Sequence, residues 1–248
     1  MPSSRSGTIA LSIEGVSKRF GGLVAVDSMS FDLAENEVLG LIGPNGSGKT
    51  TMLNLISGAL KQTAGAIRFY GEDVSAYPAS EIARRGVART FQIVRMLPSL
   101  TVLENVAAGG VFGHGRRWGR ELDDHARNLL RQVGLQGADD ASVATLTYID
   151  QKRVELARAL ASDPKVVLLD EWLAGLNPTE LRTGIALIEQ IRAQGRTIIV
   201  VEHVMDAIRS LCDRCVVMNS GAKIAEGTPR EVLADAEVIR AYLGDADA

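Results

Sequence analysis

The eight residues from Gly43 to Thr50 have the most specific chemical spacing in the chain. In order they are Gly43, Pro44, Asn45, Gly46, Ser47, Gly48, Lys49 and Thr50, the pattern of a phosphate-binding P-loop. Glycines let such a loop curl until successive N–H groups face one anion, and the following helix adds partial positive charge at its N-terminus. Lys49 would reach the terminal phosphates of a nucleotide, the Thr50 hydroxyl would hold Mg²⁺, and Thr51 completes the nucleotide-binding residues. A plain glycine-rich turn is the alternative that the motif alone leaves open.

A pair of carboxylates is the second chemical feature. The apolar run 166–169 is followed by Asp170 and Glu171. Both acids therefore lie at the C-terminal end of a predicted strand, the edge at which parallel sheets bind ligands. Asp170 suits the coordination sphere of Mg²⁺, usually through water, and Glu171 suits the base or orienting group for an attacking water. An acidic strand end without chemistry is the alternative, which an upstream P-loop weakens.

Three single residues could complete such a site. His203 follows a predicted strand, where it can donate to a γ-phosphate or polarise the attacking water. Gln92 follows the run 87–91 at the start of the predicted helical subdomain and can contact both Mg²⁺ and that water. Phe20 can stack on an adenine ring, although a phenylalanine of the core or of a hairpin fits the local sequence nearly as well.

The elements that would position these residues alternate between strands and helices. A buried strand over 37–42 precedes the P-loop and a helix over 51–57 follows it, which is the context that the motif requires. Elsewhere before residue 90, apolar runs alternate with glycine turns, which indicates antiparallel strands around the P-loop unit. Residues 93–164 change to helical periodicity, and the strand–helix alternation resumes at residue 165. The sequence therefore predicts an α/β core interrupted by a helical subdomain.

Three segments have the residues that begin helices. Thr101 and Glu104 have the spacing of a capping box, in which the side chain of each residue accepts a hydrogen bond from the backbone N–H of the other. The run 177–180 has an N-cap asparagine followed by proline at the first helical position. The run 228–231 predicts the start of a last helix.

Composition excludes several classes of protein. The chain has 248 residues, of which 46% are hydrophobic, enough for one large core. A net charge of −3 and a pI near 5.7 give no basic field of the kind that nucleic-acid binding needs. The apolar runs are far shorter than the roughly 20 residues of a membrane span, and residues 1–7 lack the apolar stretch of a signal peptide. We therefore expect a cytoplasmic protein with a disordered tail over 1–7 and no nucleic-acid partner.

Taken in chain order, these elements resemble the nucleotide-binding subunit of an ABC transporter. The motifs are an aromatic loop (Phe20), Walker A (43–50), a Q-loop (Gln92), a signature segment from Leu146, Walker B with its glutamate (Asp170, Glu171), a D-loop (174–177) and a switch histidine (His203). The resemblance implies a RecA-like P-loop NTPase core with an antiparallel β subdomain and an inserted α-helical subdomain. It also implies ATP and Mg²⁺ as cofactors, ATP hydrolysis, and peripheral attachment to the inner face of the plasma membrane through a permease.

On this resemblance, residues 8–245 form one ABC ATPase domain. The nucleotide-binding core comprises 8–92 and 165–228, the helical subdomain with the signature segment comprises 93–164, and a C-terminal helix comprises 229–245. Further likenesses lie at 89–92, 100–106, 174–178, 224–229 and 241–244.

These segments look most like the ATPase subunits of branched-chain amino-acid importers. Lipopolysaccharide-export ATPases share some of these features, so that alternative stays open for the substrate. The implied partners are a second ATPase subunit, identical or different, membrane permease subunits and, indirectly, a solute-binding protein.

The signature segment departs from the family pattern. The family usually has Leu-Ser-Gly-Gly-Gln, whereas this chain has Leu146, Thr147, Tyr148, Ile149 and Asp150. Thr147 keeps a hydroxyl at the helix start and has capping-box spacing with Asp150. Ile149 removes the close approach that glycine allows, and Asp150 adds a negative charge facing the nucleotide of a partner subunit. We expect a complete Walker A and B site and a modified signature. Trp172 replaces a usual proline and is expected to pack locally.

Other classes of function fit less well. A mechanical or regulatory ABC ATPase of DNA repair or translation typically has tandem cassettes or long coiled-coil insertions, and this sequence has neither. A nucleotide-binding module with little turnover stays open because of the altered signature, although Glu171 and His203 argue against it. A small-molecule P-loop kinase would not explain the signature helix or the switch histidine.

Overall fold

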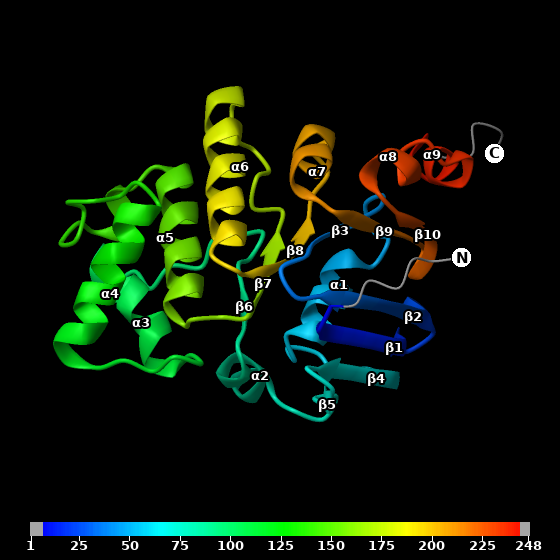
Figure 1. Ribbon diagram of the computed structural model, residues 1–248, viewed down its shortest axis with the longest axis horizontal. Coiled ribbons are helices and arrows are strands. Elements are labelled where there is room, and N and C mark those ends of the chain that lie inside the picture. Colours follow the sequence, from blue (N-terminus) through cyan, green and yellow to red (C-terminus); the bar gives the residue numbers. More distant parts are fainter. Residues whose placement is uncertain (1–6, 244–248) are drawn as a thin grey trace.

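The computed structural model describes residues 7–243, and its centre is a six-stranded, mainly parallel sheet (Figure 1). The strand order is β10-β9-β3-β8-β7-β6. The strands are β3 (Val38–Ile42), β6 (Val87–Arg89), β7 (Val166–Asp170), β8 (Thr197–Val201), β9 (Arg214–Asn219) and β10 (Ala222–Gly227). β10 pairs antiparallel with β9, and the other pairs are parallel. Every residue of β3, β7 and β8 is buried, as expected for a sheet covered on both faces.

Successive residues of the central strands face two different cores, because side chains alternate across a strand. In β3, Val38 and Ile42 belong to one core, whereas Leu39 and Leu41 belong to the other. The first core contains α6 (Pro178–Ala193), α7 (Met205–Leu211) and the helical part of the chain. The second contains α1 (Lys49–Ile56), α2 (Ala79–Arg85) and a separate antiparallel sheet.

The antiparallel sheet precedes and follows the P-loop unit in sequence. Its order is β2-β1-β4-β5, formed by β1 (Ile9–Phe20), β2 (Leu23–Ala34), β4 (Ala64–Phe69) and β5 (Glu72–Asp73). β1 and β2 form a hairpin in which Phe20 pairs with Leu23. The predicted antiparallel strands are therefore confirmed, and the hairpin places Phe20 at its turn.

The helical part contains α3 (Val102–Phe112), α4 (Gly119–Gln132), the short 3-10 helix η1 (Val143–Thr145) and α5 (Tyr148–Ala161). These helices lie together at the left of Figure 1. The Thr101 hydroxyl accepts from the Glu104 N–H, and the Glu104 carboxylate accepts from the Thr101 N–H, which confirms the predicted capping box. Asn177 and Glu180 cap α6 in the same way.

The structure differs from the predicted elements in two regions. Before residue 90, where antiparallel strands were predicted, residues 79–85 form the helix α2, and β6 pairs parallel with β7. The C-terminal region is the second. Instead of a single helix over 229–245, the structure has α8 (Pro229–Val232) and α9 (Ala236–Leu243). The physical reason is Asp235, whose carboxylate accepts hydrogen bonds from the N–H groups of Glu237 and Val238 and so begins a new helix. Residues 244 and 245, like the predicted tail apart from Gly7, lie outside the described residues.

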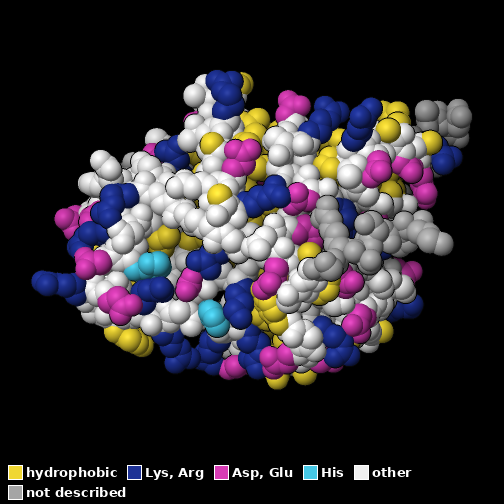
Figure 2. All heavy atoms as spheres, viewed as in Figure 1, with side chains coloured by type: hydrophobic (Ala, Val, Ile, Leu, Met, Phe, Trp, Pro, Cys, Tyr) yellow, Lys and Arg dark blue, Asp and Glu magenta, His cyan; other side chains and the backbone are white. Residues whose placement is uncertain are grey.

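The surface has mixed charge. Figure 2 shows basic and acidic side chains interspersed over one face, in keeping with the small net charge of −3. None of the helices within residues 7–243 combines the length and apolar character that a membrane span requires.

Candidate functional site

The P-loop joins β3 to α1 and requires glycine at two positions. Gly43 has a φ of +148° and Gly48 a φ of +103°, a region of backbone conformation that strains L side chains. A Cβ on Gly43 would lie 2.0 Å from the carbonyl oxygen of Met218, and one on Gly48 would lie 2.4 Å from that of Ala25. The loop is therefore enclosed between β9 and β2, which leave no room for a side chain at either glycine.

Lys49 is the first residue of α1, and its side chain is folded back onto the loop. Its Nζ donates to the carbonyl oxygens of Gly43 and Pro44, both at 2.8 Å. Burial lowers the pKa of the Lys49 ammonium, and the nearby carboxylates of Glu171 and Asp170 oppose that shift. Gly48 caps α1 without a side-chain hydrogen bond, so the N–H groups of the first turn are left for an anionic ligand.

A cleft of about 640 Å³ lies at this helix N-terminus. Its lining residues are Phe20, Leu23, Val24, Ala25, Asn45, Gly46, Gly48, Lys49, Thr50, Thr51, Gln92, Glu171, Ser220 and Gly221. Phe20 is 45% exposed, so it is a hairpin residue that borders the cleft and not a core residue. Of the predicted nucleotide-binding residues, Gly43, Pro44 and Ser47 shape the loop without lining the cleft.

The three predicted catalytic residues meet at one carboxylate oxygen. Gln92 Nε2 donates to Glu171 Oε2 at 2.7 Å, and His203 Nδ1 lies 4.0 Å from the same oxygen. Glu171 has a φ of +50°, which is uncommon for a residue other than glycine, and its N–H donates to the Val201 carbonyl at 2.8 Å. The backbone turn after β7 thus directs the carboxylate toward Gln92. Gln92 follows β6, which ends at the same edge of the sheet as β7.

Asp170 ends β7 and is buried beside a residue that the sequence analysis did not select. Arg89 Nη2 lies 2.7 Å from Asp170 Oδ2, and both side chains are almost fully buried. The other carboxylate oxygen, Asp170 Oδ1, is buried without a hydrogen-bond partner. A free carboxylate oxygen, together with the Thr50 hydroxyl and the Gln92 amide, fits Mg²⁺, which takes few protein oxygens and completes its shell with water and phosphate.

The signature segment lies at the start of α5 and does not line the P-loop cleft of its own chain. Thr147 is the N-cap: its hydroxyl accepts from the Asp150 N–H at 3.3 Å and donates to Asp150 Oδ2 at 2.7 Å. Arg153 Nη1 lies 3.1 Å from Asp150 Oδ1. The contacts with Thr147 and Arg153 therefore partly compensate the negative charge of Asp150 within the helix.

Two buried charges on α5 connect the signature helix to the cleft, and the sequence analysis missed both. Glu155 accepts hydrogen bonds from the N–H groups of Phe91 and Arg95, on either side of Gln92. Lys152 donates to three carbonyl oxygens of the loop after β7. A charged residue on the apolar face of a predicted helix could have pointed to both, because a buried charge requires a partner.

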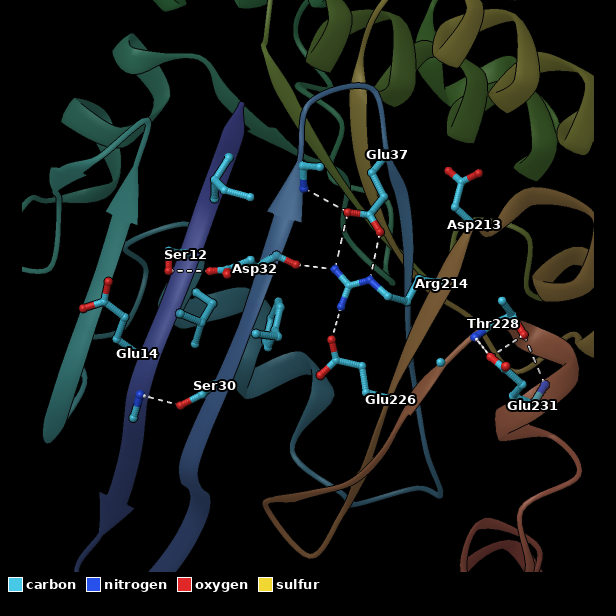
Figure 3. Close-up of a pocket in the computed structure, with 16 residues that line it drawn as sticks. Ser12, Glu14, Ser30, Asp32, Glu37, Asp213, Arg214, Glu226, Thr228 and Glu231 are labelled. Atoms are coloured by element: carbon cyan, nitrogen blue, oxygen red, sulfur yellow. Dashed lines mark hydrogen bonds and ion pairs between the residues drawn. The ribbon is translucent and has the colours of Figure 1, made fainter. Parts of the chain in front are cut away.

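A larger cavity lies elsewhere in the described chain. It has about 1060 Å³ and lies between the antiparallel sheet and the β9–β10 hairpin (Figure 3). Its charged lining is mainly acidic, comprising Glu14, Asp32, Glu37, Asp213, Glu226 and Glu231, with Arg214. Arg214 donates to Glu37 at 2.9 Å, to Glu226 and to the Asp32 carbonyl, joining β2, β9 and β10. An acidic lining repels phosphate, so electrostatics favours the P-loop cleft for a nucleotide.

The cleft lies where a strand, a glycine loop and the uncapped start of a helix meet. Two acids lie beside it at the end of a neighbouring strand. This arrangement defines a P-loop nucleotide-binding protein. The sequence profile of the ABC transporter family matches residues 26–174, and the profile of branched-chain amino acid ATP-binding cassette transporters matches residues 222–248. The chain belongs to the ABC transporter family and is an ATP-hydrolysing subunit of the transport type.

Relatives and solved structures agree over the full cassette. BraF of Pseudomonas aeruginosa, a high-affinity branched-chain amino acid transport ATP-binding protein, is 39% identical over 95% of this chain and 98% of its own. The ADP conformation of an ATP-binding cassette superposes with a TM-score of 0.88 at 31% identity, covering 96% of this chain and 99% of that one. A dimeric cassette with ADP and Pi gives a TM-score of 0.80 at 27% identity, covering 89% and 99%. The predicted family and RecA-like fold are confirmed.

Proposed function

We propose that this ATPase powers the import of branched-chain or related amino acids through a separate membrane permease, and that Glu171 is its catalytic base. The observation that carries the catalytic part is the hydrogen bond from Gln92 Nε2 to Glu171 Oε2 at the edge of the P-loop cleft. The transport part is supported by the profile over residues 222–248 and by the described role of the Pseudomonas relative.

Each residue has a separate task in the proposed reaction. Lys49 exchanges its two loop carbonyls for the terminal phosphates, which the first-turn N–H groups of α1 also hold. Glu171 accepts a proton from the attacking water, and Gln92 and His203 orient that water and stabilise charge on the phosphate. Phe20 stacks on the base. When bound, Mg²⁺ held by Thr50, Gln92 and Asp170 would neutralise charge between the phosphates.

The partners follow from the type of site. No residue of the segment Leu146–Asp150 lines the P-loop cleft of its own chain, which suits contact with the nucleotide of a second ATPase subunit. The dimeric cassette among the solved structures supports such an assembly. Permease subunits would hold this dimer at the inner face of the membrane, and a solute-binding protein would act indirectly.

Mutation of Glu171 tests the catalytic assignment. We expect Glu171→Gln to keep ATP binding and to lower ATP turnover at least 100-fold, since a general base contributes about 10²–10⁴-fold. Glu189→Gln, on the exposed face of α6, is the matched control and should turn over ATP normally. Amino-acid uptake by vesicles that contain the assembled transporter should fall in parallel. Near-normal turnover by Glu171→Gln would remove the base assignment, and turnover without leucine uptake would remove the proposed substrate class.

The modified signature predicts an asymmetric pair of sites when the second ATPase subunit is a different chain. Inactivating the glutamate after Walker B in this chain or in that subunit, one at a time, should then lower turnover unequally, with the larger loss from Glu171→Gln. Equal losses from the two changes would contradict the asymmetry.

A further inference from the structure

Lys152 is the most completely buried lysine in the described chain and lies one turn into α5. Its side chain is 1% exposed. The ammonium donates to three carbonyl oxygens of the loop that follows β7: Glu171 at 3.2 Å, Trp172 at 2.9 Å and Ala174 at 3.0 Å. A lysine has three N–H donors, so each is matched by one acceptor of this loop.

The loop is held from its other sides as well. The Trp172 indole N–H donates to the Lys152 carbonyl at 3.1 Å, so helix and loop are joined in both directions. Glu202, at the end of β8, accepts from the Leu173 N–H at 2.6 Å. The polar backbone groups of the loop are thus held by two ionisable side chains from different elements.

The held conformation is one that Glu171 would not adopt by itself. Its φ of +50° lies in the left-handed region, which is disfavoured for a residue with a Cβ. The three carbonyls must converge for Lys152 to bind them, and this convergence keeps the turn after β7 in place. The Glu171 carboxylate is thereby kept against Gln92.

We propose that Lys152 is a positioning residue for hydrolysis, which holds the loop so that the Glu171 carboxylate faces the attacking water. This inference rests on the proposed role of Glu171. It adds a function for a residue that does not line the P-loop cleft and that lies on the signature helix.

Separating turnover from binding tests the proposal in the full chain assembled with its second ATPase subunit and permease. Lys152→Met should lower kcat for ATP at least 10-fold, while KM and nucleotide affinity stay within 2-fold, because the P-loop is untouched. Lys152→Arg keeps the charge and the donors and should recover most of the lost kcat. Lys152→Gln keeps two N–H donors but has no charge. It replaces Lys152→Met in these measurements if the methionine variant does not fold.

Leu156→Ala is the matched structural control, because Leu156 is buried on the same helix and its side chain has no donor for the three carbonyls. It should lower stability without lowering kcat. If Leu156→Ala lowers kcat as much as Lys152→Met does, or if Lys152→Met turns over ATP normally, the positioning role is wrong.

Two further measurements separate this inference from the role of Glu171. In a Glu171→Gln background, Lys152→Met should cause no further loss of turnover, because residues that act as a unit are not additive. In a Trp118→Phe background, emission from Trp172, then the one remaining tryptophan of the sequence, should shift in Lys152→Met and not in Leu156→Ala. Normal turnover by Glu171→Gln would overturn the base assignment, whereas an unshifted Trp172 emission would overturn the contact from Lys152.

Discussion

Replacing Glu202 with glutamine should make the stability of the protein less dependent on pH. Glu202 is 1% exposed, and one of its oxygens, Oε2, has no hydrogen-bond partner. Burial raises the pKa of Glu202 from the ordinary 4.5 to about 7; the Leu173 N–H and Lys152 oppose the rise, and Glu171 adds to it. The amide of Glu202→Gln does not titrate and can still accept from the Leu173 N–H.

The sign follows from the protons that each state binds. Between pH 4.5 and 7 the unfolded chain has released this proton while the native protein keeps it, so stability falls as pH rises. A gap of about 2.5 pH units corresponds to roughly 3 kcal/mol at most. Glu202→Gln should therefore gain up to about 3 kcal/mol over the wild-type protein between pH 4.5 and pH 8.

Urea unfolding, followed by tryptophan emission at several values of pH between 4.5 and 8, measures this difference. The exposed variant Glu189→Gln is the control and should follow the wild-type protein at every pH. Parallel stability curves for Glu202→Gln and the wild-type protein would refute the reasoning, because they would mean that Glu202 is ionised in the native state near its ordinary pKa.

Three further predictions concern the elements around the site. Gly48→Ala should abolish ATP binding in an equilibrium dialysis assay, because its Cβ would lie 2.4 Å from the Ala25 carbonyl oxygen; retained affinity would contradict the enclosure of the P-loop. Arg214→Met should lower the free energy of unfolding in urea by about 2 kcal/mol or more, since it removes the hydrogen bonds that Arg214 donates to Glu37, Glu226 and the Asp32 carbonyl. A loss below about 1 kcal/mol would show that Arg214 does not join the two sheets. Thr101→Ala should cost about 1 kcal/mol in the same assay through loss of the α3 N-cap, and an unchanged midpoint would mean that α3 begins without it.

Features that depend on near neighbours in sequence could be predicted. The P-loop and the caps at Thr101 and Asn177 are local patterns, and the structure contains all three. The meeting of Gln92 and Glu171 followed from the rule that parallel strands present their carboxyl ends at one edge.

Features that depend on distant partners could not be predicted in the same way. Nothing near Lys152 in sequence specifies the three carbonyls that it binds, because they lie beyond the strand that follows its helix. The pairing of Arg89 with Asp170 likewise needs the register between β6 and β7. The second C-terminal helix was missed because one aspartate, Asp235, restarts a helix without a glycine or proline to mark the break.

The position of β3 in the sheet has a consequence for the order in which the protein is made. β3 leads into the P-loop, yet its two neighbours, β8 and β9, come from the last third of the sequence. The loop itself is closed by the β9–β10 turn, where the Gly221 N–H donates to the Ser47 carbonyl at 3.0 Å. During synthesis, the P-loop residues leave the ribosome long before β8, β9 and β10 have been made. We therefore expect the growing chain to be unable to capture ATP until the β9–β10 hairpin has emerged.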